Sequence, residues 1–128
     1  HYFRDFAYCD SGMIPWLLVA ELISVSKKPI SDMVSKRIEA FPSSGEINST
    51  LTDPEAAIKR VLAEYKAKAT SIDYTDGYSL AFSERSGEWR FNLRASNTEP
   101  VIRLNVESKH DVALMEMNTV KILEILRQ

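Results

Sequence analysis

Residues 88–106 read EWRFNLRASNTEPVIRLNV, and this stretch decides the fold of the second half of the chain. Apolar and polar residues alternate from Trp89 to Arg94 and again from Ile102 to Val106. Side chains of a β-strand point to opposite faces of a sheet with a period of two, so the pattern predicts strands over residues 88–94 and 101–106. If the apolar sets face the core, Arg94 and Arg103 lie on the polar face at the two ends of one loop.

The loop between these strands carries short polar side chains that can donate hydrogen bonds and that tolerate turn geometry. A phosphate dianion needs many donors and positive charge in a small volume. The planar guanidinium of arginine matches phosphate oxygens, and hydroxyl groups can fill the remaining acceptors. One interpretation of the pattern is therefore a phosphate site formed by Arg94, Ser96, Asn97, Thr98 and Arg103.

A second interpretation of the same pattern is an exposed hairpin with scattered arginines, because charged residues are common on exposed sheet faces. Glu99 favours this interpretation slightly, since a carboxylate beside an anion site has to point away or pair with an arginine. The alternation alone leaves the two interpretations open.

The residues around this hairpin predict an α+β fold, an antiparallel sheet flanked by helices. Asp53 followed by Pro54 is typical of a helix start, and Asp111 is expected to open a last helix over the apolar positions 112, 115, 119, 122 and 126. Further strands are predicted over residues 46–51, 71–74 and 78–83, with a hairpin around Ser86-Gly87.

The first part of the chain has a different character. The sequence begins with an aromatic segment and a turn at residues 10–12, and a helix is predicted over residues 13–26. This helix is apolar around most of its surface, so it has to pack against other elements on more than one side. Lys27-Lys28-Pro29 then breaks the helical pattern before a short helix that Ser31 or Asp32 opens and that runs to about Glu39. We expect residues 1–28 to be the end of a preceding domain and 29–128 to form the C-terminal domain.

Composition and charge narrow the class of protein. The 128 residues are 45% hydrophobic and 27% charged, with a formal net charge of −2, which is ordinary for a soluble globular protein and argues against nucleic-acid binding. The apolar run from Met13 to Ile23 is too short for a membrane span. A lone cysteine, Cys9, fits the cytoplasm, and the missing initiator methionine suggests a piece of a longer protein.

The order of residues in the loop points further. Arg-x-Ser-Asn-Thr-Glu-Pro-x-x-Arg, from Arg94 to Arg103, resembles the phosphate-binding loop in the last domain of the α-D-phosphohexomutase superfamily. Residues 1–12, Phe41-Pro42, 44–48, Thr75-Asp76-Gly77 and 101–108 resemble the bacterial phosphomannomutases of that superfamily, so the resemblance covers essentially the whole chain.

The resemblance implies an isomerase of carbohydrate metabolism with four domains. Such enzymes interconvert mannose 6-phosphate and mannose 1-phosphate, which feeds GDP-mannose biosynthesis, through a phosphoserine, a hexose 1,6-bisphosphate intermediate and Mg²⁺. Their third domain reads the sugar, and their last domain, with a fold similar to TATA-box-binding proteins, clamps the substrate phosphate. Carried over by position, Arg94, Ser96, Asn97 and Thr98 contact phosphate, and Arg103 is either a direct contact or a brace.

The resemblance also implies what this chain lacks. Neither the active-site serine pattern nor the aspartate-rich Mg²⁺ loop of the family occurs, and Asp53, Asp73 and Asp76 read as isolated turn or cap residues. We therefore expect no catalytic residue and no metal ligand here, and no activity of this chain alone. Whether His1 belongs to the sugar-recognition loop stays open.

The expected partners are a phosphosugar and the remaining domains of the same enzyme, with no nucleic acid and no membrane. Phosphoglucomutase and dual-specificity phosphohexomutase are the near alternatives. Glucosamine mutases usually carry glycine where Asn97 stands, which counts against that choice. A free-standing binding module is the alternative from another class.

Overall fold

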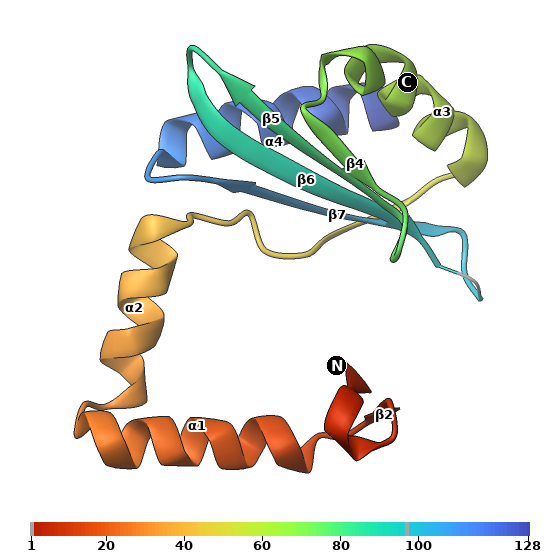
Figure 1. Ribbon diagram of the computed structural model, residues 1–128. Helices are drawn as coiled ribbons and strands as arrows, with labels where there is room; N and C mark the ends of the chain where they lie inside the picture. Colours follow the sequence, from red (N-terminus) through yellow and green to blue (C-terminus); the bar gives the residue numbers. More distant parts are fainter. Residues whose placement is uncertain (1, 97) are drawn as a thin grey trace. The chain divides into compact units, whose positions relative to one another are not determined.

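The computed structural model describes residues 2–96 and 98–128, and this part of the chain divides into two compact units, His1–Arg37 and Ile38–Gln128 (Figure 1). The predicted domain division after residue 28 stays a prediction.

The first unit opens with a small hairpin that the sequence did not predict. Strand β1 (Tyr2–Phe3) pairs antiparallel with β2 (Cys9–Asp10), and the 3-10 helix η1 (Arg4–Phe6) lies between them. Ala7 and Tyr8 turn the chain with φ angles of 53° and 56°, which residues other than glycine adopt rarely. The N–H of Tyr8 closes the turn by donating to the carbonyl oxygen of Phe3 at 3.0 Å.

Helix α1 (Met13–Ser26) follows with the predicted bounds. The hydroxyl of Ser11 accepts hydrogen bonds from the N–H groups of Met13 and Ile14, at 3.2 and 3.3 Å. It thereby caps the helix, because the first N–H groups of a helix have no acceptor within the helix. None of the described residues of α1 is buried, and large apolar side chains such as Trp16 and Leu22 are more than half exposed. Helix α2 (Ile30–Ala40) begins slightly before the predicted start.

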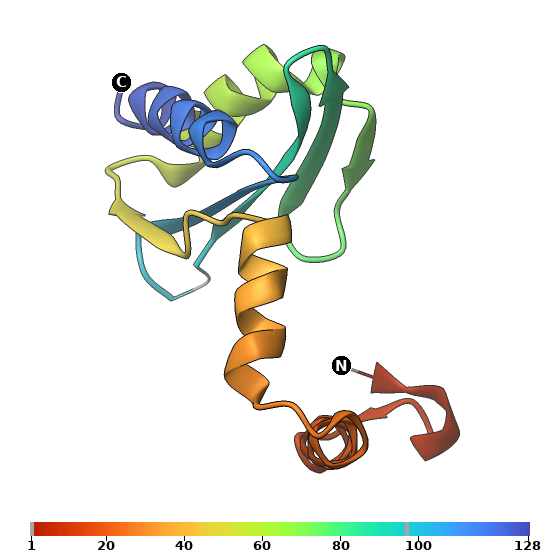
Figure 2. The same cartoon turned by 90° about the vertical axis from the view of Figure 1, so that its left-hand side faces the viewer.

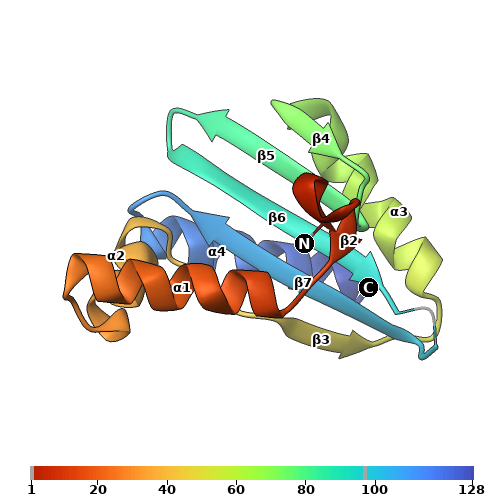
Figure 3. The same ribbon diagram turned by 60° about the horizontal axis from the view of Figure 1, so that its bottom comes forward.

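The described residues of the second unit form a five-stranded antiparallel sheet in the order β3-β7-β6-β5-β4 (Figure 3). The strands are β3 (Ile47–Thr50), β4 (Ser71–Asp73), β5 (Tyr78–Glu84), β6 (Gly87–Ala95) and β7 (Val101–Ser108). Each coincides with a predicted strand to within two residues, and β5 and β6 form the predicted hairpin.

Helices α3 (Pro54–Tyr65) and α4 (Val112–Leu126) lie on the same side of this sheet, and the short 3-10 helix η2 (Lys66–Lys68) follows α3 (Figure 2). Both helices start at the predicted aspartates: Asp53 accepts from the N–H of Ala56 and Asp111 from the N–H of Leu114, each at 2.9 Å. The predicted α+β fold, an antiparallel sheet flanked by helices, is confirmed.

The core lies between the sheet and these helices. The apolar strand residues are almost fully buried, namely Leu80, Phe82, Trp89, Phe91, Leu93, Ile102, Leu104 and Val106. Phe82 stacks on Trp89 with ring centroids 4.1 Å apart, and the edge of Tyr65 from α3 contacts both rings. The predicted buried face of α4 is buried apart from Val112, which is exposed. Leu114 and Asn118, which were not part of the prediction, are also buried.

Candidate functional site

The polar face of the sheet carries a ladder of matched side chains across β6 and β7. Arg94 lies directly opposite Arg103, Asn92 opposite Asn105, and Arg90 opposite Glu107. The prediction that both arginines share the polar face is confirmed, and the register adds that they are direct cross-strand neighbours. Such neighbours have Cβ atoms only about 5 Å apart, so one ligand can reach both side chains.

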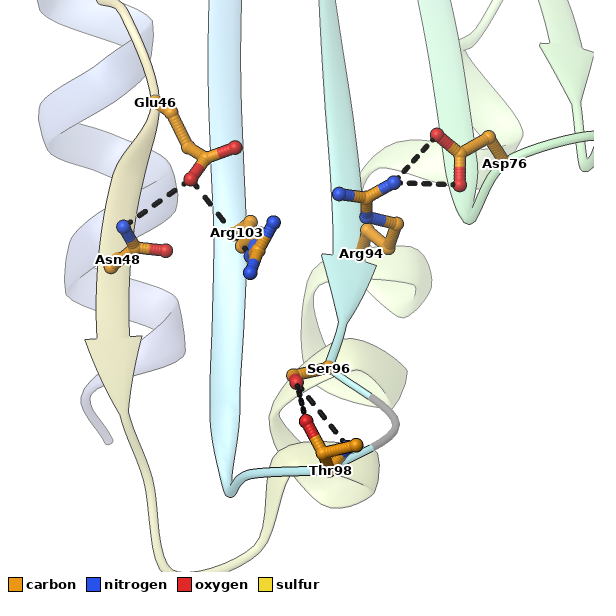
Figure 4. Close-up of polar contacts among 7 residues, drawn as sticks. All are labelled: Glu46, Asn48, Asp76, Arg94, Ser96, Thr98 and Arg103. Atoms are coloured by element: carbon orange, nitrogen blue, oxygen red, sulfur yellow. Dashed lines mark hydrogen bonds and ion pairs between the residues drawn. The ribbon is translucent and has the colours of Figure 1, made fainter.

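Like charges directly opposite each other destabilise a sheet, and here a carboxylate lies beside each arginine (Figure 4). Nη1 of Arg94 donates to both carboxylate oxygens of Asp76, at 2.9 and 3.0 Å. Nε of Arg103 is 3.8 Å from Oε1 of Glu46. These side chains are between 38% and 69% exposed, so each ion pair contributes at most about 1 kcal/mol to stability.

Arg103 is held less firmly than Arg94. Its Nε atom is buried and has no hydrogen-bond partner within residues 2–96 and 98–128, because the 3.8 Å contact with Glu46 is too long for a hydrogen bond. A buried donor without an acceptor is costly, so an acceptor that reached this nitrogen would stabilise the site. This geometry is compatible both with a direct contact between Arg103 and phosphate and with a brace for the loop.

The loop after β6 brings hydroxyl groups together next to Arg94. Oγ of Ser96 is 3.4 Å from Oγ1 of Thr98 and also accepts from the N–H of Thr98 at 3.4 Å. The N–H of Ser96 donates to the carbonyl oxygen of Val101 at 2.8 Å and closes the loop. Because the Ser96 N–H is used in this way, its hydroxyl is the group that can face a ligand. Asn97, the remaining predicted contact, lies outside the described residues.

The turn at Thr75-Asp76-Gly77 supplies the partner of Arg94. Gly77 has φ +77°, and a Cβ atom there would lie 2.6 Å from the carbonyl oxygen of Leu93 on β6. Nδ2 of Asn92 donates to the backbone carbonyl of Asp76 at 2.8 Å. A glycine is therefore required for the turn to lie against β6, and this approach places the Asp76 carboxylate beside Arg94.

The same turn has an internal acceptor. The hydroxyl and the N–H of Thr75 donate to the Asp73 carboxylate at 2.6 and 2.8 Å, and these bonds, the hydroxyl first, hold the pKa of Asp73 below its ordinary value. Asp53 is a helix cap as predicted, whereas Asp73 is the last residue of β4 and accepts from the turn that follows. Asp76 lies in a turn as predicted, but it is not isolated, because its carboxylate is ion-paired with Arg94. The sequence indicates Asp76 only through the Asp-Gly turn between two predicted strands, and this turn does not reveal that Arg94 is the partner of Asp76.

A hollow of about 180 Å³ lies on this face, lined by both arginines and both carboxylates together with Asn92 and Asn105. A larger hollow, about 540 Å³, is lined on one side by Arg94, Asp76 and Ala95 and on the other by Ile58, Lys59 and Leu62 of α3. Arg94 and Asp76 line both. The smaller hollow is the one in which a single anion can reach Arg94 and Arg103.

Cys9 and His110, the other reactive side chains considered in the sequence, are not among the residues that line the two hollows. Cys9 is exposed, and His110 is a positive-φ residue whose ring lies 6.3 Å from that of Phe41. Across the described residues, no group of three or more His, Cys, Asp and Glu side chains is arranged to hold a metal ion. None of the described helices combines the length and the apolar character that a membrane span requires. His1 is outside the described residues.

Comparison with known families matches both parts of the chain. Residues 46–120 match the family model described as phosphoglucomutase/phosphomannomutase, C-terminal domain, and residues 1–41 match phosphoglucomutase/phosphomannomutase, alpha/beta/alpha domain III. The first match covers the sheet described above, and the C-terminal domain of this family has the fold similar to TATA-box-binding proteins that the sequence predicted.

Curated relatives agree. The chain is 58% identical over 128 residues to a phosphomannomutase of Salmonella typhimurium and 57% identical over 128 residues to one of Escherichia coli K12. It is 55% identical over 127 residues to a protein of Xanthomonas campestris named phosphohexose mutases. These alignments include 99 to 100% of the chain, which spans 27 to 28% of the length of these relatives.

A prediction follows from the contact of Gly77 with β6. Gly77→Ala places a methyl group against the Leu93 carbonyl oxygen, whereas Gly45→Ala, at φ +67°, meets no atom within 4 Å. Both variants carry backbone strain of about 1 to 3 kcal/mol. We expect Gly77→Ala to lose more free energy of unfolding than Gly45→Ala in urea denaturation, because it adds the clash. Equal losses would contradict the assigned close approach.

Proposed function

Because this chain belongs to the phosphoglucomutase/phosphomannomutase family, we propose that it is the phosphate-binding C-terminal part of a phosphomannomutase, which interconverts mannose 6-phosphate and mannose 1-phosphate. One observation carries the proposal. Arg94 and Arg103 lie directly opposite each other beside a loop with two clustered hydroxyl groups, and both line one small polar hollow.

In this proposal the site binds the phosphate that does not react. Arg94 forms charge-assisted hydrogen bonds with the phosphate oxygens, Ser96, Asn97 and Thr98 donate to the remaining ones, and Arg103 contributes positive charge directly or braces the loop. Binding at this end of the sugar fixes the other end against the phosphoserine, so binding energy is used for orientation at the reacting centre.

The same site has to serve two orientations of one ligand. A hexose 1,6-bisphosphate intermediate presents either phosphate in turn, so a clamp that read the sugar closely would favour one orientation. The groups near the proposed phosphate position are the guanidinium groups, each paired with a carboxylate, the side-chain amides of Asn92 and Asn105, and the hydroxyl groups of the loop, and the donors among them recognise charge and oxygen. A clamp of this chemistry suits the intermediate.

Mg²⁺ belongs to the proposed enzyme, but the described residues of this chain do not form a ligand cluster for it. In this proposal the ion and the phosphoserine belong to other domains of the enzyme. The partners are then a phosphosugar and those domains, with neither nucleic acid nor membrane. The proposed setting is the cytoplasm, where mannose 1-phosphate would supply GDP-mannose biosynthesis.

A second candidate is a mutase that accepts glucose phosphates or both sugars. The name of the relative from Xanthomonas campestris, phosphohexose mutases, favours this alternative. The phosphate site cannot distinguish mannose phosphates from glucose phosphates, because it binds the phosphate group that both substrates share. Comparing kcat/KM of the complete enzyme for mannose, glucose and glucosamine phosphates decides between them, and a preference for glucose phosphates would replace the mannose assignment.

The proposed function is tested by a chemical-shift titration of the isotopically labelled chain. We expect mannose 6-phosphate to shift the amide signals of Ser96 and Thr98 and the Nε signal of Arg94. Duplex DNA at the same concentration serves as the comparison for a free-standing binding module. The proposal fails if the sugar phosphate leaves these signals unchanged while DNA shifts residues of the sheet.

Removing the Arg94 side chain tests its assigned role. In the complete enzyme, Arg94→Ala is expected to lower kcat/KM by an amount equivalent to roughly 2 to 5 kcal/mol, because a charged hydrogen-bonded partner of phosphate is lost. Arg90→Ala is the matched control, since Arg90 lies on the same strand and face but pairs with Glu107 at 2.6 Å. Similar effects of the two variants would support the interpretation as scattered arginines.

The isolated 128-residue chain should not catalyse the mutase reaction, because the serine pattern and the Mg²⁺ loop of the family do not occur in its sequence. A coupled assay for mannose 6-phosphate formation from mannose 1-phosphate, with added Mg²⁺ and bisphosphate, measures this. Turnover that rises in proportion to purified chain would refute the prediction.

A further inference from the structure

The Asp76 carboxylate engages only one edge of the Arg94 guanidinium. Both of its oxygens accept from Nη1, at 2.9 and 3.0 Å (Figure 4). Among residues 2–96 and 98–128, no hydrogen bond from Nη2 or Nε of Arg94 is formed. A guanidinium binds an oxyanion through two parallel N–H groups. Because Nη1 is occupied, the pair left for a bidentate contact is Nε and Nη2.

Asp76 is itself fixed by the strand that carries Arg94. Nδ2 of Asn92 donates to the Asp76 carbonyl oxygen at 2.8 Å and to Oγ of Ser79 at 2.9 Å. Gly77 lies against the Leu93 carbonyl oxygen, where no larger residue fits without a shift. The backbone that carries the carboxylate is therefore held against β6 at Asp76 and Gly77, so the carboxylate can set the direction of the arginine.

The direction matters because Arg103 lies across from Arg94. Repulsion between the two guanidinium groups separates them, but it does not determine the conformation of the Arg94 side chain. Asp76 holds it on the side of the 75–77 turn, while Arg103 contacts Glu46 on the side of β3 (Figure 4). The two arginines then border the same hollow of about 180 Å³.

We propose that Asp76 is a positioning residue of the phosphate site, which holds the Arg94 guanidinium with its Nε and Nη2 groups directed to the phosphate. This role rests on the proposed function. Pre-ordering a long side chain reduces the entropy that phosphate binding costs. The carboxylate also repels the dianion, but it is 69% exposed, so water and salt screen that repulsion. We therefore expect the ordering effect to exceed the repulsion.

A titration with inorganic phosphate tests the role. The labelled 128-residue chain is compared with Asp76→Ala, Asp76→Asn, Arg94→Ala and the double variant Asp76→Ala/Arg94→Ala, with shifts followed at Ser96 and Thr98. We expect Asp76→Ala to weaken phosphate binding about three- to tenfold and Asp76→Asn to weaken it less, because its amide oxygen still accepts from Nη1. In the Arg94→Ala background, removal of Asp76 should change nothing.

Each outcome bears on a stated claim. If Asp76→Ala binds phosphate as tightly as the unmodified chain, or more tightly, the carboxylate does not position Arg94 for binding, and the inference is overturned. It is also overturned if Asp76→Ala weakens binding equally with and without Arg94, since the effect would then be a general loss of structure. Absence of phosphate-dependent shifts in the unmodified chain contradicts the proposed function, and the positioning role falls with it.

Discussion

The register between β6 and β7 is the constraint on which the rest of this structure depends. It is fixed by burial, because Phe91, Leu93, Leu104 and Val106 face the helices and are at most 1% exposed. A slip by one residue would move each of them to the opposite face and bring arginines into the core. The hydrophobic requirement therefore also decides that Arg94 and Arg103 lie side by side on the polar face.

That placement has a cost, and several features of the second unit offset it. Two guanidinium groups as direct cross-strand neighbours repel each other, so each is accompanied by a carboxylate from a different segment of the chain. For Arg94 the carboxylate is placed by a turn that only glycine permits at residue 77. Core packing, sheet register, turn conformation and site charge are thus linked through one pair of strands.

How far the sequence predicts this molecule depends on how local each feature is. Strand alternation and the aspartate caps of α3 and α4 are short-range patterns, and they predicted the second unit and the face that carries Arg94. The partners Asp76 and Glu46 come from distant segments, and nothing local reveals which arginine a carboxylate meets. The hairpin of β1 and β2 was not predicted, because its turn is formed by Ala7 and Tyr8 and contains no glycine. The role of Asn97, outside the described residues, stays a prediction.

The central claim is that one phosphate group binds between Arg94 and the Ser96–Thr98 hydroxyls, within reach of Arg103. The most direct measurement is a crystal structure of the chain with mannose 6-phosphate. We expect density for the phosphate in the hollow that both arginines line, with oxygens in hydrogen-bond contact with Nε and Nη2 of Arg94 and with the Ser96 hydroxyl. Phosphate bound elsewhere on the domain, with Arg94 still paired only to Asp76, would contradict it.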